Sequence, residues 1–159
     1  METLFFSGFA MKSMPIKFSK LNPEIETPKY HSAEAAGFDI ASAEDLVIKP
    51  GEAPIIKTGI VIQAPEGHFL LLAARSSLPV KKGLMLANGV GILDRDYCGP
   101  DDEIKIQVYN FTNHDVAVAK GERIAQGIFM PAARGEFTEA ARIKETSRGS
   151  HGSTGGYNA

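Results

Sequence analysis

The polar segment from Asn88 to Gly99 contains the residue types of this chain that are best suited to chemistry. Glycines at positions 89 and 91 allow the backbone to approach a bound group closely. Asp94 supplies a carboxylate that can take a proton from water, and Tyr97 supplies a flat ring. We interpret the segment as a β-hairpin that carries a small-molecule pocket. The alternative is a surface hairpin in which Asn and Asp only form the turn.

A second polar segment, Arg75-Ser76-Ser77, follows an apolar run and precedes a possible helix start. Arginine presents a planar fork of donors that matches phosphate oxygens. Two hydroxyls and the backbone N–H groups of a helix start would add further donors. These features indicate a phosphate site. The alternative is a helix N-cap beside a surface arginine.

The end of the chain, from Ser147 onward, is rich in glycine and serine and poor in apolar residues. The run from Arg148 to Gly156 is similar to a phosphate-binding loop, but it lacks the lysine of a Walker A sequence and no helix follows it. Such a segment can bind phosphate when it is ordered by a ligand. The alternative is a mobile tail without a binding role.

Length and composition restrict the classes of protein that this chain can represent. Its 159 residues fit one domain with a sizeable core. The formal net charge of -2 argues against a nucleic-acid partner, although a nucleotide needs only a local positive cluster. The single Cys98 cannot form an intrachain disulfide, which favours a reducing, cytoplasmic location. No apolar run is long enough to span a membrane, so we expect no membrane partner.

Short aliphatic and β-branched segments alternate with Pro/Gly turns, and this pattern favours a β-sandwich or barrel. We expect one short helical turn over 77–82 and divide the chain into an N-terminal extension (1–14), a β domain (15–146) and a flexible C-terminal arm (147–159). The expected strands are 16–18, 46–48, 55–62, 68–74, 104–109, 116–118, 123–129 and a last strand over 137–143.

Five segments, in this order, resemble the motifs of the trimeric dUTP pyrophosphatases (dUTPases). They are Ala35 to Ile40, Ala74 to Leu78, Asn88 to Gly99, Arg123 to Gly127, and the tail from Arg148 to Gly156. The resemblance runs from about Pro15 to the C-terminus. The tail departs from the family pattern, because a pair of glycines before the aromatic position is missing and His151 stands at that position.

The resemblance implies an all-β, jelly-roll-like subunit of a homotrimer, with three sites at subunit interfaces and each tail closing over a site. It also implies hydrolysis of dUTP to dUMP and diphosphate with Mg²⁺. The reaction would limit uracil in DNA and supply dUMP for dTTP synthesis. A triphosphate can hold Mg²⁺ together with water, so we expect no direct protein ligand to the metal. Asp39 would belong to the network around the metal and the attacking water.

The resemblance also assigns roles to single residues. Asp94 would activate the attacking water; the rival carboxylate Asp96 is set aside because the family's catalytic aspartate precedes the tyrosine by three residues. Arg148 would hold the γ-phosphate and His151 would stack on uracil. The other substrate-binding residues by this resemblance are Arg75, Ser76, Ser77, Asn88, Gly91, Ile92, Leu93, Tyr97, Lys105, Gln126, Gly152, Ser153 and Thr154.

Two other functions stay open at this point. A dCTP deaminase shares the implied fold but requires a catalytic glutamate, for which Glu103 is the nearest candidate. A catalytically silent nucleotide-binding trimer is the other, because the shortened tail could prevent closure over the site.

Overall fold

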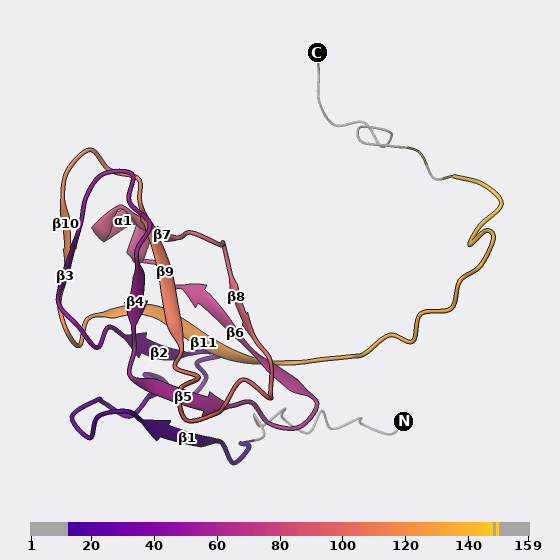
Figure 1. Ribbon diagram of the computed structural model, residues 1–159, viewed down its shortest axis with the longest axis horizontal. Coiled ribbons are helices and arrows are strands. Elements are labelled where there is room, and N and C mark those ends of the chain that lie inside the picture. Colours follow the sequence, from indigo (N-terminus) through magenta and orange to yellow (C-terminus); the bar gives the residue numbers. More distant parts are fainter. Residues whose placement is uncertain (1–12, 148, 150–159) are drawn as a thin grey trace, which may run out of the picture.

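A computed structural model describes residues 13–147 and 149, and the described chain is built almost entirely of β-strands (Figure 1). The predicted all-β, jelly-roll-like class is confirmed. The strands are β1 (Lys17–Lys20), β2 (Phe38–Ala41), β3 (Leu46–Ile48), β4 (Ile55–Lys57), β5 (Ile60–Gln63), β6 (His68–Ala74), β7 (Leu84–Leu86), β8 (Gly91–Leu93), β9 (Lys105–Asn110), β10 (Val116–Val118) and β11 (Arg123–Pro131).

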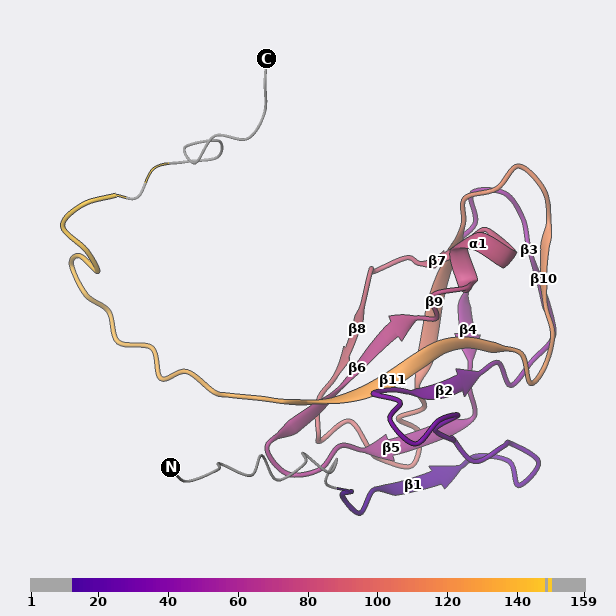
Figure 2. The same cartoon turned by 180° about the vertical axis from the view of Figure 1, so that it is seen from behind.

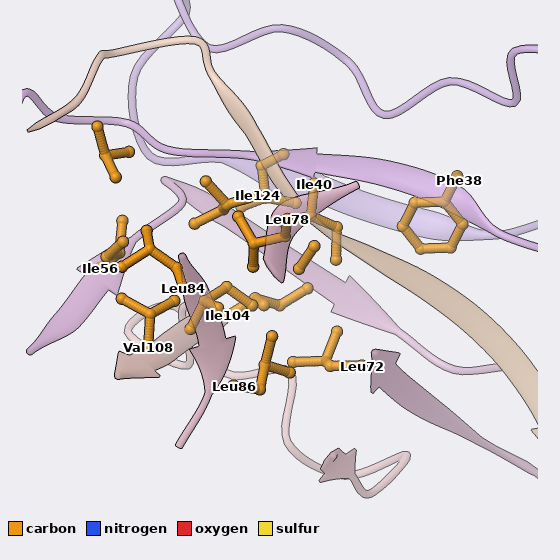
Figure 3. Packing of buried hydrophobic residues seen from close by; sticks show 14 of the residues in the cluster. Phe38, Ile40, Ile56, Leu72, Leu78, Leu84, Leu86, Ile104, Val108 and Ile124 are labelled. Carbon is orange, nitrogen blue, oxygen red and sulfur yellow. The ribbon is translucent and has the colours of Figure 1, made fainter. Parts of the chain in front are cut away.

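The strands form two larger sheets and two strand pairs, and every pairing is antiparallel. One sheet has the order β2-β11-β6-β8 and the other β4-β9-β7, while β1 pairs with β5 and β3 with β10. Figure 3 shows that buried side chains from both larger sheets meet in one core, with Ile40 and Ile124 on one side and Leu84 and Val108 on the other. This core fixes the sheet edge at which β2, β11 and β6 display polar residues.

Alternation of apolar and polar residues explains why β9 forms where the sequence predicts it. Ile106 and Val108 are buried, whereas Lys105 and Gln107 between them are exposed. The expected strand over 55–62 is instead interrupted at Thr58 and Gly59. The Thr58 hydroxyl donates to the Ile104 carbonyl at 2.6 Å, and Gly59 adopts a φ of 67° that favours glycine. The chain therefore changes partner strand at this point.

The predicted hairpin around Asn88 is wrong in its pairing. A turn separates β7 from β8, but β7 pairs with β9 and β8 pairs with β6. Gly91 lies against Leu72 on β6, where an added Cβ would be 3.0 Å from the leucine side chain. The glycine is needed for this close approach of β8 to β6, so the segment joins two sheets and does not fold back on itself.

The predicted helical turn is confirmed as α1 (Leu78–Lys82). Pro79 lies in its first turn, and Leu78 is the residue that it buries in the core. Gly83 closes the helix in the left-handed region, with its N–H donating to the Pro79 carbonyl at 3.0 Å. Among the described residues no helix is long and apolar enough to cross a membrane.

The chain leaves the domain after β11, as Figures 1 and 2 show. The expected last strand over 137–143 is wrong, because this segment is irregular chain without a strand partner. Phe137 and Ile143 are almost completely exposed. Apolar side chains at these positions find no surface to cover within the described part of the same chain.

Candidate functional site

Asp39 lies at the centre of a cluster of ion pairs in the four-stranded sheet. The cluster lies where β11 begins and β6 ends, and this border of the sheet is called the sheet edge here. Its Oδ1 accepts from Arg75 Nε at 3.0 Å, and its Oδ2 accepts from Arg123 Nη1 at 3.0 Å. His31 Nε2 lies 3.3 Å from the same Oδ2. The fold explains the meeting: Asp39 lies on β2, Arg123 begins β11, and Arg75 directly follows β6, three neighbouring strands of one sheet.

The cluster carries more positive than negative charge. Two guanidinium groups face one carboxylate, whose side chain is 15% exposed, while Arg75 and Arg123 remain partly open to solvent. Arg75 is oriented further by a bond from its Nη1 to the Arg123 carbonyl at 3.3 Å. Excess guanidinium charge with free donors suits phosphate oxygens. The same charge makes Asp39 a poor direct ligand for a divalent cation.

Gln126 lies beside this cluster on β11, opposite Asp39 on one neighbouring strand and Ala73 on the other. Its Nε2 donates to the Ala74 carbonyl at 3.0 Å, which fixes the amide plane. A Cβ on Gly37 would lie 3.0 Å from the Gln126 Oε1. The small residue before β2 therefore leaves room for this amide oxygen next to the arginine pair.

The loop after β6 holds the two predicted serines. Ser76 is exposed and Ser77 is half-buried at the N-cap of α1. The Ser77 side chain makes no capping hydrogen bond to the helix. Its hydroxyl is therefore not used by a helix cap, which weakens the purely structural interpretation of this segment.

The segment after β7 exposes the residues that were predicted to hold a nucleoside. Asn88 is exposed in the turn, Ile92 is 64% exposed on β8, and Leu93 is half-buried. Asp94 is exposed just beyond β8, and the Tyr97 N–H donates to the Asp94 carbonyl at 3.2 Å. Residues 94–97 thus form a turn, so the strict alternation of a strand does not govern which of Asp94 and Asp96 lies near Tyr97.

Tyr97 is tied to a buried anchor. Its hydroxyl donates to the Glu103 carbonyl at 3.2 Å, and the Glu103 side chain accepts the Gly59 N–H at 2.6 Å. Glu103 is only 8% exposed. Because its carboxylate already serves a buried backbone donor, Glu103 has a structural role here, and this argues against its use as a deaminase's catalytic acid.

The cluster that contains Arg75 and the segment that contains Asp94 are not brought together within one chain. Leu93 pairs with Leu70, so Asp94 lies beside Phe69 at the start of β6, whereas Arg75 directly follows the end of β6, six residues beyond Phe69. At about 3.3 Å per residue, this places Asp94 and Arg75 about 20 Å apart. Lys105 is exposed at the start of β9, in the other sheet.

Several predicted residues lie outside the described residues: Arg148, His151, Gly152, Ser153 and Thr154. Arg123 and His31, by contrast, join the cluster without having been singled out from the sequence. Arg123 stands three positions before Gln126 at a strand start, a spacing that could have drawn attention to it. His31 lies in an irregular loop, where no periodic pattern marks a partner.

Among the described residues, no group of three or more His, Cys, Asp or Glu side chains is arranged to hold a metal ion. The cluster instead consists of two guanidinium groups around the single Asp39 carboxylate, with the amide of Gln126 beside them. The fold and this site together define an all-β domain of the kind that binds a phosphorylated small molecule at a sheet edge.

Comparison with known proteins identifies the family. The dUTPase family model matches residues 23–155. The deoxyuridine 5'-triphosphate nucleotidohydrolase of Nautilia profundicola is 40% identical over 144 residues, which are 89% of this chain and 99% of that protein. The Lactococcus lactis enzyme of the same name is 42% identical over 137 residues, 84% of this chain and 91% of that protein. The chain belongs to the dUTPase family, and we assign it to the dUTP diphosphatases on that basis.

Solved structures agree with this assignment. The dUTPase of Streptococcus mutans matches with a TM-score of 0.71 and 37% identity, over 76% of this chain and 98% of that one. The dUTPase of Staphylococcus bacteriophage 80alpha with dUPNHPP matches with a TM-score of 0.79 and 25% identity, over 90% of this chain and 99% of that one. The divergent tail does not prevent the likeness from covering most of the chain.

Proposed function

We propose that this protein hydrolyses dUTP to dUMP and diphosphate. The observation that carries the proposal is the cluster of Asp39, Arg75 and Arg123 at the sheet edge of a dUTPase-family chain. Its excess positive charge fits a triphosphate, the feature that separates this substrate from a nucleoside. The bacteriophage 80alpha relative with dUPNHPP bound supports a nucleotide in the corresponding fold.

Arg75 binds the phosphate chain, with Ser76 and Ser77 adding hydroxyl and backbone N–H donors. Asp39 keeps Arg75 in place through the 3.0 Å bond to its Nε, and the donors of the guanidinium that neither Asp39 nor the Arg123 carbonyl uses face the ligand. Gln126, fixed by the Ala74 carbonyl, offers its amide oxygen near the reacting phosphate. These assignments give each polar group at the edge a partner.

Asp94 acts as the general base. Its exposed carboxylate takes a proton from a water molecule, whose oxygen attacks the α-phosphorus in line with the leaving group. The bond from the α-phosphorus to the bridging oxygen breaks, and diphosphate leaves with that electron pair. Arg75 and Arg123 stabilise the negative charge that develops on the leaving phosphates.

Mg²⁺ neutralises triphosphate charge and fixes its conformation when bound. The residues present fit an ion that is held by phosphate oxygens and water. The cluster offers guanidinium donors and an engaged Asp39, and it does not offer a set of free carboxylates. We therefore expect no direct protein ligand to the metal.

The nucleoside binds in the segment from Asn88 to Tyr97. Extended backbone at β8 can pair with the polar edge of uracil, and Asn88 adds an amide donor and acceptor. Tyr97, held through its hydroxyl by the Glu103 carbonyl, packs against the sugar and leaves little room for a 2′-hydroxyl. Cytosine presents a different donor pattern and would leave polar groups unpaired.

The protein acts as a homotrimer with sites shared between subunits. The separation of about 20 Å between Arg75 and Asp94 along one chain supports this arrangement, because one triphosphate cannot use both from the same subunit. The segment between β11 and the arm leads away from its own domain, and its exposed Phe137 supports contact with another copy. Arg148, His151, Gly152, Ser153 and Thr154 would then close over a neighbour's site. We place the reaction in the cytoplasm, where it keeps dUTP low and supplies dUMP.

The first experiment is to measure diphosphate release with Mg²⁺ from dUTP, dCTP, dTTP and UTP in parallel. Fast release from dUTP alone is expected, because the nucleoside segment excludes the other bases and the ribose. Release of ammonia from dCTP would instead favour a deaminase. Tight dUTP binding without release of diphosphate would favour a silent nucleotide-binding trimer.

A further inference from the structure

His31 makes two polar contacts in the cluster of Asp39, Arg75 and Arg123, here named the phosphate cluster. Its Nε2 lies 2.9 Å from Arg123 Nη1 and 3.3 Å from Asp39 Oδ2. A guanidinium nitrogen can only donate, so Nε2 accepts the Arg123 proton. This contact is a hydrogen bond in the tautomer that carries its proton on Nδ1 and leaves Nε2 as the acceptor.

The loop that carries His31 is anchored at the two residues that directly precede it. The Asp39 N–H donates to the Lys29 carbonyl at 3.2 Å, and the ring of Tyr30 packs edge-on against Phe38 with centroids 5.7 Å apart. Burial raises the pKa of Tyr30, so its hydroxyl stays neutral next to this packing. These anchors lie directly before His31 and hold its imidazole beside the Asp39 carboxylate.

The two bonds from Arg123 use one nitrogen. Nη1 donates to Asp39 Oδ2 at 3.0 Å and to His31 Nε2 at 2.9 Å, and such a nitrogen carries a proton for each. The planar guanidinium is thereby fixed in orientation, with the donors on its other nitrogens available to an anion. A single bond to Asp39 would leave the group free to rotate about that contact.

Because of this geometry, we propose that His31 is a positioning residue for triphosphate binding: as a neutral acceptor it orients Arg123. The inference rests on the proposed dUTP hydrolysis. Protonation of His31 removes the acceptor, places a cation beside Arg123 and turns Nε2–H toward Asp39 Oδ2. Arg123 then loses one partner and competes for the other. The geometry thus predicts weaker triphosphate binding in acid, although the total positive charge of the site increases.

Other charged groups surround His31 and enter this balance. Arg75 pairs with Asp39, the carboxylate that His31 contacts. A cavity of about 430 Å³ adjoins His31, and charged residues of both signs line it from the loop before β2 and the turn before β11. These groups are Glu24, Glu26, Lys29 and Lys120. Lys120 and Glu24 form an ion pair at 3.3 Å, which reduces their net effect on the imidazole.

The experiment compares His31→Gln, His31→Leu and the control His114→Gln with wild type, with KM and kcat for dUTP measured from about pH 5 to about pH 9. Glutamine keeps an acceptor oxygen that does not titrate, whereas leucine has none. His114 is an exposed histidine on the loop before β10, remote in sequence from the cluster contacts. Inorganic tripolyphosphate, titrated calorimetrically into the same four proteins, reports phosphate binding without turnover.

At alkaline pH we expect His31→Leu to raise KM and weaken tripolyphosphate binding roughly 2- to 10-fold, as for the loss of one hydrogen bond, and to lower kcat by no more than that factor, because Arg123 also stabilises the leaving phosphates. His31→Gln should match wild type there, but its KM should rise less in acid than that of wild type. His114→Gln should follow wild type throughout. Protonation of the substrate and of Asp94 affects all four proteins alike and cancels in this comparison.

An unchanged KM in His31→Leu, or an acid profile of His31→Gln identical to that of wild type, overturns the role of His31. A wild-type KM that falls in acid also overturns it, because added charge would then dominate over orientation. Absence of dUTP hydrolysis by wild type contradicts the proposed function instead. In that case the tripolyphosphate titrations still decide whether His31 orients Arg123.

Discussion

Asp94 lies just beyond β8 and is exposed, and this placement allows a direct test of its proposed role as general base. Asp94→Asn keeps the size of the side chain and removes its ability to take a proton. We expect kcat for dUTP to fall by roughly 10²- to 10⁴-fold, the range for general base catalysis, with binding retained. Steady-state diphosphate release and calorimetric binding measure the two effects.

Asp96 supplies the matched control for this substitution. It lies two residues away on the same turn and is equally exposed. Asp96→Asn should leave kcat within a small factor of wild type. Normal turnover in Asp94→Asn would show that Asp94 is not the base. A larger loss of kcat in Asp96→Asn would assign the base to Asp96.

The residues of the phosphate cluster show what a sequence can and cannot reveal. Asp39, Arg75 and Gln126 were predicted from the motifs that contain them, and the fold brings all three to one sheet edge. Arg123 and His31 were not predicted as site residues. Their roles depend on distances between segments that are far apart in the chain, and no local pattern encodes such distances.

At the level of the elements, Glu103 joins the β4–β5 connection to the turn that holds Tyr97. Glu103→Ala leaves the buried Gly59 N–H without its acceptor. We expect the free energy of unfolding to fall by about 1–3 kcal/mol, the typical cost of an unsatisfied buried donor. Urea denaturation of the purified variant measures this loss.

Two further variants separate the hydrogen bond from other effects of the change. Glu103→Gln keeps an acceptor oxygen and should lose less stability than the alanine variant. Glu66→Ala removes a carboxylate from an exposed turn and should be nearly neutral. Equal stability of Glu103→Ala and wild type would show that this bond does not hold the connection.

The strands were largely predictable, and the exceptions have physical causes. Alternation marks β9 because one face packs on the core and the other does not. The pattern does not state which strand pairs with which, so the segment from Asn88 to Gly99 was wrongly predicted to be a hairpin, whereas its strand β8 pairs with β6. Residues 137–143 have the composition of a strand, but a strand also needs a neighbour, and this segment has none in the described chain.

For the whole molecule, the separation of Arg75 from Asp94 leads to a mixing experiment. Arg75→Ala and Asp94→Asn subunits are each expected to be inactive alone. Co-refolded in equal amounts, they should regain activity, because some shared sites receive a normal Arg75 from one copy and a normal Asp94 from another. Diphosphate release before and after mixing measures the recovery.

Mixing of the two folded proteins without subunit exchange provides the control and should give no recovery. A double variant, Arg75→Ala with Asp94→Asn, mixed with either single variant should also stay inactive, because no site can then obtain both groups intact. If the co-refolded single variants do not regain diphosphate release, one chain supplies both Arg75 and Asp94 to its own site.

The proposed sharing of each site, with Asp94 from one copy and Arg75 from another, also has a genetic consequence. In a cell that expresses normal and defective alleles together, a subunit without Asp94 spoils only the site to which it gives that residue, and activity falls in proportion to its abundance. A subunit that lacks both groups spoils two sites, so activity falls with the square of the normal fraction. The milder allele would behave as recessive, whereas the double-defective one would act as a dominant inhibitor of its normal partner.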